Sequence, residues 1–137
     1  MAALTADRNT PTRKSDLIER PAAAGLTYYA GALAALDANG RIVPAATATT
    51  LRGLGRIERY VDNEDGANDA VTVPVRRGTF RWSNSAAGDA ITAADIGVDC
   101  YIVDDQTVAK TSGGNTRSIA GRIMDVDANG VWVRSGY

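Results

Sequence analysis

The sequence predicts an all-β protein: a small sandwich or barrel, for which a jelly-roll arrangement is one option, with an extended N-terminal arm. Short apolar runs recur along the 137 residues and are separated by turns rich in Gly, Asn and Asp, which is typical of β-proteins. Helical periodicity is nearly absent. Hydrophobic residues make up 45% of the chain, but alanine supplies many of them, so we expect the thin core of a sandwich or barrel.

Residues 1–24 differ from the rest of the chain and are predicted to form the arm. Charged residues of both signs follow one another here, Pro11 and Pro21 interrupt the segment, and no strand or helix period runs through it. A terminus of this kind is either disordered or becomes ordered on a partner, and its residues do not decide between the two. For the second case, the candidate contact residues of the arm are Leu4, Arg8, Arg13, Lys14, Leu17 and Ile18.

A single β-domain is expected over residues 25–137. The tetrapeptide Asp-Ala-Asn-Gly occurs at 37–40 and again at 127–130, and each copy predicts a hairpin turn, because Asn and Gly tolerate positive φ. Residues 91–96 predict one helical turn, which Thr92 caps and Gly97 ends. The strands are expected at 26–29, 32–36, 41–44, 54–61, 71–76, 100–103, 107–111, 119–126 and 131–134.

Two apolar sets of opposite parity lie between residues 71 and 82. Residues 71–75 carry valines at odd positions, whereas Phe80 and Trp82 occupy even positions. In one regular strand the two sets would face opposite sides of the sheet. We therefore expect a bulge or tight bend at 76–78 that brings both sets into one core. Pro74 has no N–H to donate, which predicts an edge strand or a bulge at its position.

The composition argues against most catalytic and metal-dependent functions. The chain has no histidine, which excludes Ser-His-Asp catalysis and histidine-ligated zinc, and its one cysteine, Cys100, can form no intrachain disulfide. A carboxylate hydrolase would need two convergent acids, but the acidic groups of this chain lie in turns, where they usually cap the backbone. Residues 125–130 match the opening of an EF-hand loop, yet Gly136 stands where that loop needs Glu. We predict no catalytic, cofactor-binding or metal-binding residues and no enzyme activity.

Charge and hydropathy narrow the range of partners. The formal net charge of −1 gives no basic excess that would favour nucleic acid or an anionic membrane. No apolar run approaches the length that spans a bilayer, and Asp7 and Arg8 precede any stretch that could serve as a signal peptide. We therefore expect no membrane partner and synthesis in a cytoplasm.

One basic and aromatic cluster favours an alternative function, a small β-barrel nucleic-acid-binding module. Arginines that meet phosphates and aromatic rings that stack on bases form such a surface when they share one face. In a strand, however, Arg81 must point away from its neighbours Phe80 and Trp82. Nucleic acid is therefore the less favoured partner. The cluster consists of Arg76, Arg77, Phe80, Arg81 and Trp82.

Five segments carry a resemblance that covers nearly the whole chain. They are LTADRNTPTRKSD (4–16), YYAGALAALDANG (28–40), VRRGTFRWSNS (75–85), DAITAADIGVDCYIVDDQTVAKT (89–111) and AGRIMDVDANGVWVR (120–134). In their order, and with this chain length, they resemble the capsid decoration (cement) proteins of tailed bacteriophages. No single segment is diagnostic, since each also follows the ordinary pattern of strands and turns.

The resemblance implies a structural virion protein on the outer surface of the capsid. It implies a β-fold that binds the major capsid protein, bridges its subunits and stabilises the shell. It also implies a homo-oligomer, either a dimer or a trimer, synthesised in the cytoplasm of a host bacterium. The family has no catalytic residues to carry over, and its shell-binding positions vary too much to be transferred to residues of this chain.

Overall fold

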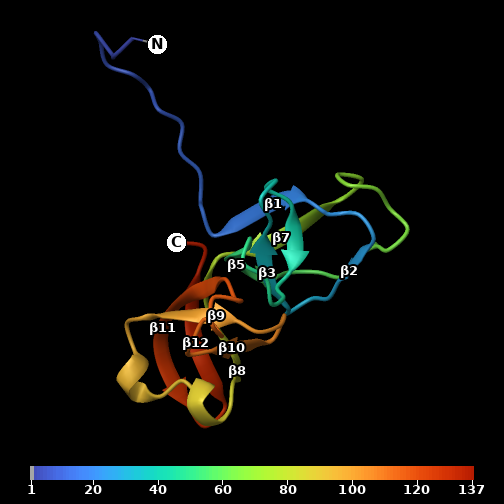
Figure 1. Ribbon diagram of the computed structural model, residues 1–137. Helices are drawn as coiled ribbons and strands as arrows, with labels where there is room; N and C mark the ends of the chain where they lie inside the picture. Colours follow the sequence, from blue (N-terminus) through green and yellow to red (C-terminus); the bar gives the residue numbers. More distant parts are fainter. Residues whose placement is uncertain (1) are drawn as a thin grey trace.

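The structure, a computed structural model, describes residues 2–137 and is almost entirely β. Its strands form a five-stranded sheet, a closed five-stranded barrel and a two-stranded sheet (Figure 1). Two short 3-10 helices, η1 (Ala87–Asp89) and η2 (Ala93–Asp95), connect strands of the barrel. The all-β class predicted from the sequence is confirmed, in the form of a small barrel joined to a sheet.

We call the five-stranded sheet the first sheet. In spatial order it contains β1 (Leu17–Pro21), β7 (Thr72–Arg76), β5 (Arg52–Ile57), β3 (Leu33–Leu36) and β4 (Ile42–Pro44). The barrel contains β10 (Thr107–Ala109), β8 (Gly78–Asn84), β12 (Gly130–Ser135), β11 (Ile119–Asp127) and β9 (Asp99–Ile102). The two-stranded sheet pairs β2 (Leu26–Tyr28) with β6 (Val61–Asn63).

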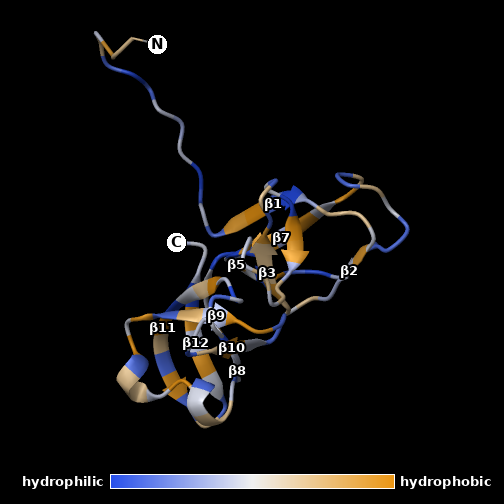
Figure 2. Ribbon diagram, viewed as in Figure 1, coloured by the Kyte–Doolittle hydropathy of each residue, from blue (hydrophilic) through white to orange (hydrophobic). Residues whose placement is uncertain are grey.

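The molecule has two hydrophobic cores, one packed against the first sheet and one inside the barrel. Apolar strands are visible in both parts of the molecule (Figure 2). Large buried side chains of the barrel core include Trp82, Ile102, Ile123, Val131 and Val133. Those of the first-sheet core include Tyr28, Ile42, Ile57, Val73 and Val75. The apolar residues of this short chain are therefore divided between two small cores.

Strand β3 contributes to both cores. Side chains alternate along a strand, so neighbouring residues face opposite sides. Leu33 and Ala35 lie in the barrel core, whereas Ala34 lies in the first-sheet core. The first sheet is thus packed against the barrel through one of its own inner strands.

The break expected at residues 76–78 is present, but its consequence differs from the prediction. Strand β7 ends at Arg76 and β8 begins at Gly78. Val73 and Val75 are buried in the first-sheet core, whereas Trp82 is buried in the barrel core and Phe80 packs against it. The prediction of one common core is wrong, because the chain passes from the first sheet into the barrel at this point.

Pro74 lies inside a sheet, not in the edge strand or bulge that was predicted. Strand β7 lies between β1 and β5, and it pairs with β1 in regular register. The Pro74 carbonyl accepts a hydrogen bond from the Glu58 N–H (3.0 Å), which places its backbone groups on the β5 side. Strand β5 has already ended at Ile57 there. Proline is tolerated because no strand residue needs its missing N–H.

Both predicted hairpins are confirmed. Strand β3 pairs with β4 across the first Asp-Ala-Asn-Gly turn, and β11 pairs with β12 across the second. In each turn the aspartate carboxylate accepts the N–H of the asparagine two residues later, at 2.8 Å from Asp37 and at 2.7 Å from Asp127. The helical turn is also confirmed: η2 follows Thr92, whose N–H donates to the Asp95 carboxylate (2.8 Å).

The boundaries of one strand and of the arm differ from the prediction. The strand expected over 54–61 is divided into β5 and β6, because the chain turns between Ile57 and Val61, which are both buried in the first-sheet core. The arm expected over 1–24 contains β1, which pairs with β7 from Leu17 to Pro21. Ala22 is fully buried and bridges Ile42 of β4. The folded body therefore begins at Leu17. No residue of β1 is fully buried, so its sequence lacks the apolar alternation that marks a half-buried strand.

Candidate partner-binding arm

Residues 2–16 form an extended segment, which we call the arm, that leaves the folded body (Figure 1). They belong to no strand or helix, and residues 2–15 are exposed. Leu4, the one large apolar residue of the arm, is 71% exposed. A segment that contributes little to the cores of its own chain is available to become ordered on another molecule.

The arm and the rest of the protein have opposite charge. Between residues 2 and 15 there are three basic residues, Arg8, Arg13 and Lys14, against the single acidic residue Asp7. Since the whole chain has a formal net charge of −1, the remainder is net negative. The positive charge of the arm favours contact with an acidic surface of a partner.

Charged side chains fix the arm where it enters the body. Arg76 of β7 donates from Nη1 to the Asp16 carboxylate (2.6 Å) and from Nε to Glu58. Glu58 also accepts from Nη2 of Arg56 (3.1 Å). Donation to Glu58, with smaller contributions from Asp16, raises the pKa of the Arg76 guanidinium, which therefore stays charged. One arginine thus connects the arm to two strands of the first sheet.

Hydrogen bonds to backbone carbonyls at the same place set the direction in which the arm leaves the body. The N–H of Arg77 donates to the carbonyl of Asp16 (2.6 Å), and Nε of Arg77 donates to the carbonyl of Ser15 (2.9 Å). Residues 2–14 lie beyond these contacts. The arm therefore has a fixed root and a free outer part.

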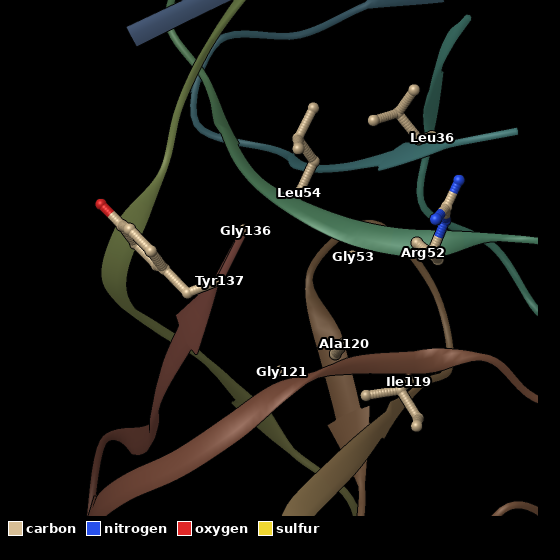
Figure 3. A pocket seen from close by; sticks show the side chains of 9 residues that line it. All are labelled: Leu36, Arg52, Gly53, Leu54, Ile119, Ala120, Gly121, Gly136 and Tyr137. Atoms are coloured by element: carbon tan, nitrogen blue, oxygen red, sulfur yellow. The ribbon is translucent and has the colours of Figure 1, made fainter. Parts of the chain in front are cut away.

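A cleft of about 480 Å³ lies close to this root, between the first sheet and the barrel (Figure 3). Its lining includes Leu36 and Leu54 from the first sheet, Ile119 from β11, and Tyr137 at the chain end. Ile119 and Tyr137 are 46% and 69% exposed. Apolar side chains left exposed around a cleft are typical of a surface that contacts another protein.

Arg77 connects the cleft to the arm. Its guanidinium lies 6.0 Å from the ring centre of Tyr137, while its Nε binds the carbonyl of Ser15. Arg134 lies against the same tyrosine ring, at 4.4 Å. The arm root and the cleft therefore form one continuous face of the molecule, which we call the arm face.

The structure separates the candidate residues of the arm into two groups. The side chains of Leu4, Arg8, Arg13 and Lys14 lie on the exposed arm. Leu17 and Ile18 lie in β1, where Leu17 is 46% exposed and Ile18 packs against the first-sheet core. Ile18 therefore holds β1 in the sheet, whereas Leu17 remains accessible.

Sequence reasoning missed the residues that hold the arm. Asp16 and Arg76 are separated by sixty positions, and nothing in the local pattern pairs them. Their partner Glu58 lies in the turn after β5. Only the pairing of β1 with β7, which brings the start of one strand beside the end of the other, would have indicated this contact.

The basic and aromatic cluster is dispersed in the fold. Arg76 and Arg77 lie at the arm root, where they bind carboxylate and carbonyl groups. Trp82 is buried in the barrel core, and Phe80 packs against that core. Arg81 lies on the outside of the barrel over the ring of Trp132, at 5.8 Å. Phe80, Arg81 and Trp82 line one groove, and Arg76 and Arg77 do not belong to its lining.

Residues 2–137 contain no group of three or more Cys, Asp or Glu side chains arranged to hold a metal ion. Burial raises the pKa of the Cys100 thiol to about 12, so the thiol stays protonated and unreactive. No helix in this part of the chain is long and apolar enough to cross a membrane. Comparison of the chain with protein-family models, with curated proteins and with solved structures finds no match.

Proposed function

We propose that this chain is a structural virion protein that decorates the outside of a phage capsid and stabilises it by bridging major capsid protein subunits. The observation that carries the proposal is the exposed, positively charged arm fixed at its root to a compact β-body. The sequence resemblance to capsid decoration proteins, which includes residues 4–16 of the arm, supports the same function.

The geometry suits a protein that holds neighbouring subunits together. The body rests on one subunit while the arm reaches a second, since thirteen extended residues (2–14) span up to about 45 Å. Repetition of the contact over a symmetric shell multiplies weak binding into strong retention. A homo-dimer or homo-trimer would add to this effect by joining several arms in one particle.

The test uses co-sedimentation with expanded, empty phage heads that lack the protein. The full chain should bind saturably, at a fixed ratio to capsid subunits, and the decorated heads should survive higher temperature. A chain lacking residues 2–14 keeps Ser15 and Asp16 and should remain folded. It should bind heads about tenfold more weakly.

Matched variants of the arm separate charge from length. Replacing Arg8, Arg13 and Lys14 by glutamine should weaken binding in a salt-dependent way, because these residues meet acidic groups. The control Asp7→Asn raises the positive charge of the arm and should bind at least as well as the natural chain. Failure of the full chain to bind the matched heads would reject the function. Equal binding by the truncated chain would reject the role of the arm.

A further inference from the structure

One side of β8 is only partly paired. Strand β12 pairs with it from Gly78 to Trp82. On the other side β10 pairs with it only at Ser83 and Asn84. Within residues 2–137, no strand pairs with β8 on that side from Thr79 to Trp82. The closed barrel therefore retains a short open edge.

The direction of the backbone shows which groups this edge presents. The N–H of Ser83 donates to the carbonyl of Gln106 (2.8 Å), on the β10 side. Backbone groups of successive strand residues point to alternate sides. The N–H and C=O groups of Arg81 and Thr79 therefore point to the open side, while those of Phe80 face β12.

A groove of about 470 Å³ runs along the open edge. Arg56 and Arg81 line it together with aromatic residues, and no acidic side chain does so. The Arg56 guanidinium lies 4.6 Å from the ring centre of Phe80, and the Arg81 guanidinium lies 5.8 Å from that of Trp132. Glu58 holds Arg56 from outside the groove lining.

We propose that this edge is a docking site for an extended, acidic peptide segment of a partner protein, which adds as a strand beside Thr79–Trp82. Main-chain hydrogen bonds to Thr79 and Arg81 supply affinity, and carboxylates that meet Arg56 and Arg81 supply specificity. Arg56 also contacts Glu58 of the arm root, but the site does not include the arm and does not depend on the proposed function.

Charge selects this occupant over the arm of a second copy. That arm is extended too, but it carries Arg8, Arg13 and Lys14. These residues would meet two further arginines in the groove. A partner strand with glutamate or aspartate at alternate positions fits both the edge and the charge.

The test is a titration of the full-length, ¹⁵N-labelled protein with the peptide acetyl-SVEVTVET-amide, followed by amide chemical shifts. We expect saturable shifts at Thr79 and Arg81 and slower hydrogen exchange of their N–H groups. The matched peptide acetyl-SVKVTVKT-amide should bind about tenfold more weakly, because its lysines face the arginines.

Two variants at position 81 separate the contribution of the main-chain hydrogen bond from that of the charge. Arg81→Pro removes an N–H that faces the open side, where proline is tolerated, and should raise the Kd about tenfold. Arg81→Gln keeps the N–H and should raise it about threefold. Arg122→Gln, on β11, should leave the Kd unchanged. Unchanged amide spectra elsewhere in the protein establish that the variants fold.

Three results would overturn the proposal. The absence of shifts at Thr79 and Arg81 would reduce Arg81 to a charge that keeps an exposed edge from aggregating. Equal binding of the two peptides would reject the acidic partner. Shifts that depend on protein concentration without peptide, and disappear when residues 2–14 are deleted, would assign the edge to the arm of a second copy.

Discussion

The barrel and the first sheet reach closure in different ways. Strand pairing continues around the whole barrel, although parts of β8 and β11 are unpaired on one side. The first sheet ends at β1 and β4, and the isolated bridge between Ala22 and Ile42 connects these ends. Arg20 adds a hydrogen bond to the carbonyl of Gly40 (3.3 Å). The barrel is therefore closed by strand pairing, whereas the ends of the first sheet, which carries the arm, are joined by one bridge and one side-chain hydrogen bond.

Substitutions in the two cores should have the largest effect on stability and test whether the barrel and the first sheet unfold together. Ile102 and Ile57 are both fully buried, in the barrel and in the first sheet respectively. Ile102→Ala and Ile57→Ala should each reduce the free energy of unfolding by about 2–5 kcal/mol. Because Leu33 of β3 lies in the barrel core, the two units should unfold in one shared transition. Both variants should lower its urea midpoint, measured by tryptophan fluorescence.

The fluorescence of Trp82 reports on the barrel core, which makes the comparison decisive. If Ile57→Ala leaves the midpoint of the tryptophan signal where it is in the natural protein, the two units unfold independently. That result would contradict the shared transition.

A smaller effect is expected at the junction between the units. A Cβ atom added at Gly53 of β5 would lie 2.1 Å from the backbone oxygen of Ala120 in β11. Gly53→Ala must therefore push the two sheets apart and should cost about 1–3 kcal/mol in thermal or urea unfolding. At Gly88 an added Cβ meets nothing within 4 Å. Gly88→Ala is the control and should change stability by less than about 0.5 kcal/mol; equal losses would mean that the junction is not tightly packed.

The smallest expected effect is on the pH dependence of stability. The Trp132 indole N–H donates to the Asp127 carboxylate (2.9 Å) and, with backbone N–H groups, holds the pKa of Asp127 below its ordinary value of 3.8. In the first sheet, Arg41 lowers the pKa of Asp69 in the same way. A carboxyl group with a lowered pKa stabilises the fold above its ordinary value, and this contribution is lost as the pH falls through the lowered value.

Asp127→Asn and Asp69→Asn should therefore be slightly less stable than the natural protein at pH 7. Each difference should shrink below pH 3.8. Melting temperatures measured between pH 7 and pH 2.5 would check this. A difference that stays constant with pH would mean that packing, not charge, explains the loss.

Local signals predicted the strands and turns of this fold well, but they did not predict which sheet a strand would join. The two Asp-Ala-Asn-Gly turns illustrate the limit. Both contain the same hydrogen bond from asparagine N–H to aspartate, yet Asp127 pairs directly with Gly130, whereas the first turn separates the pair Leu36 and Ile42. Four residues determine the local turn, and the register of the flanking strands determines the length of the loop.

The same limit applies to the candidate site. The exposed part of the arm was predictable, because its charges and Pro11 prevent a buried face. Its root was not, because Asp16 meets Arg76 only after β1 has paired with β7. The open edge of β8 was equally hidden, since it depends on β10 pairing with just the last two residues of that strand.

The position of the chain ends has a practical consequence for display of foreign domains. Arg77 contacts Ser15 and lies beside Tyr137, so the arm root and the C-terminus share the arm face. A domain fused after Tyr137 would stand beside the arm and compete for the space of its partner. The turn at Asn129 lies at the other end of β12. An insertion there would project cargo away from the arm face and leave both the arm and the cleft uncovered.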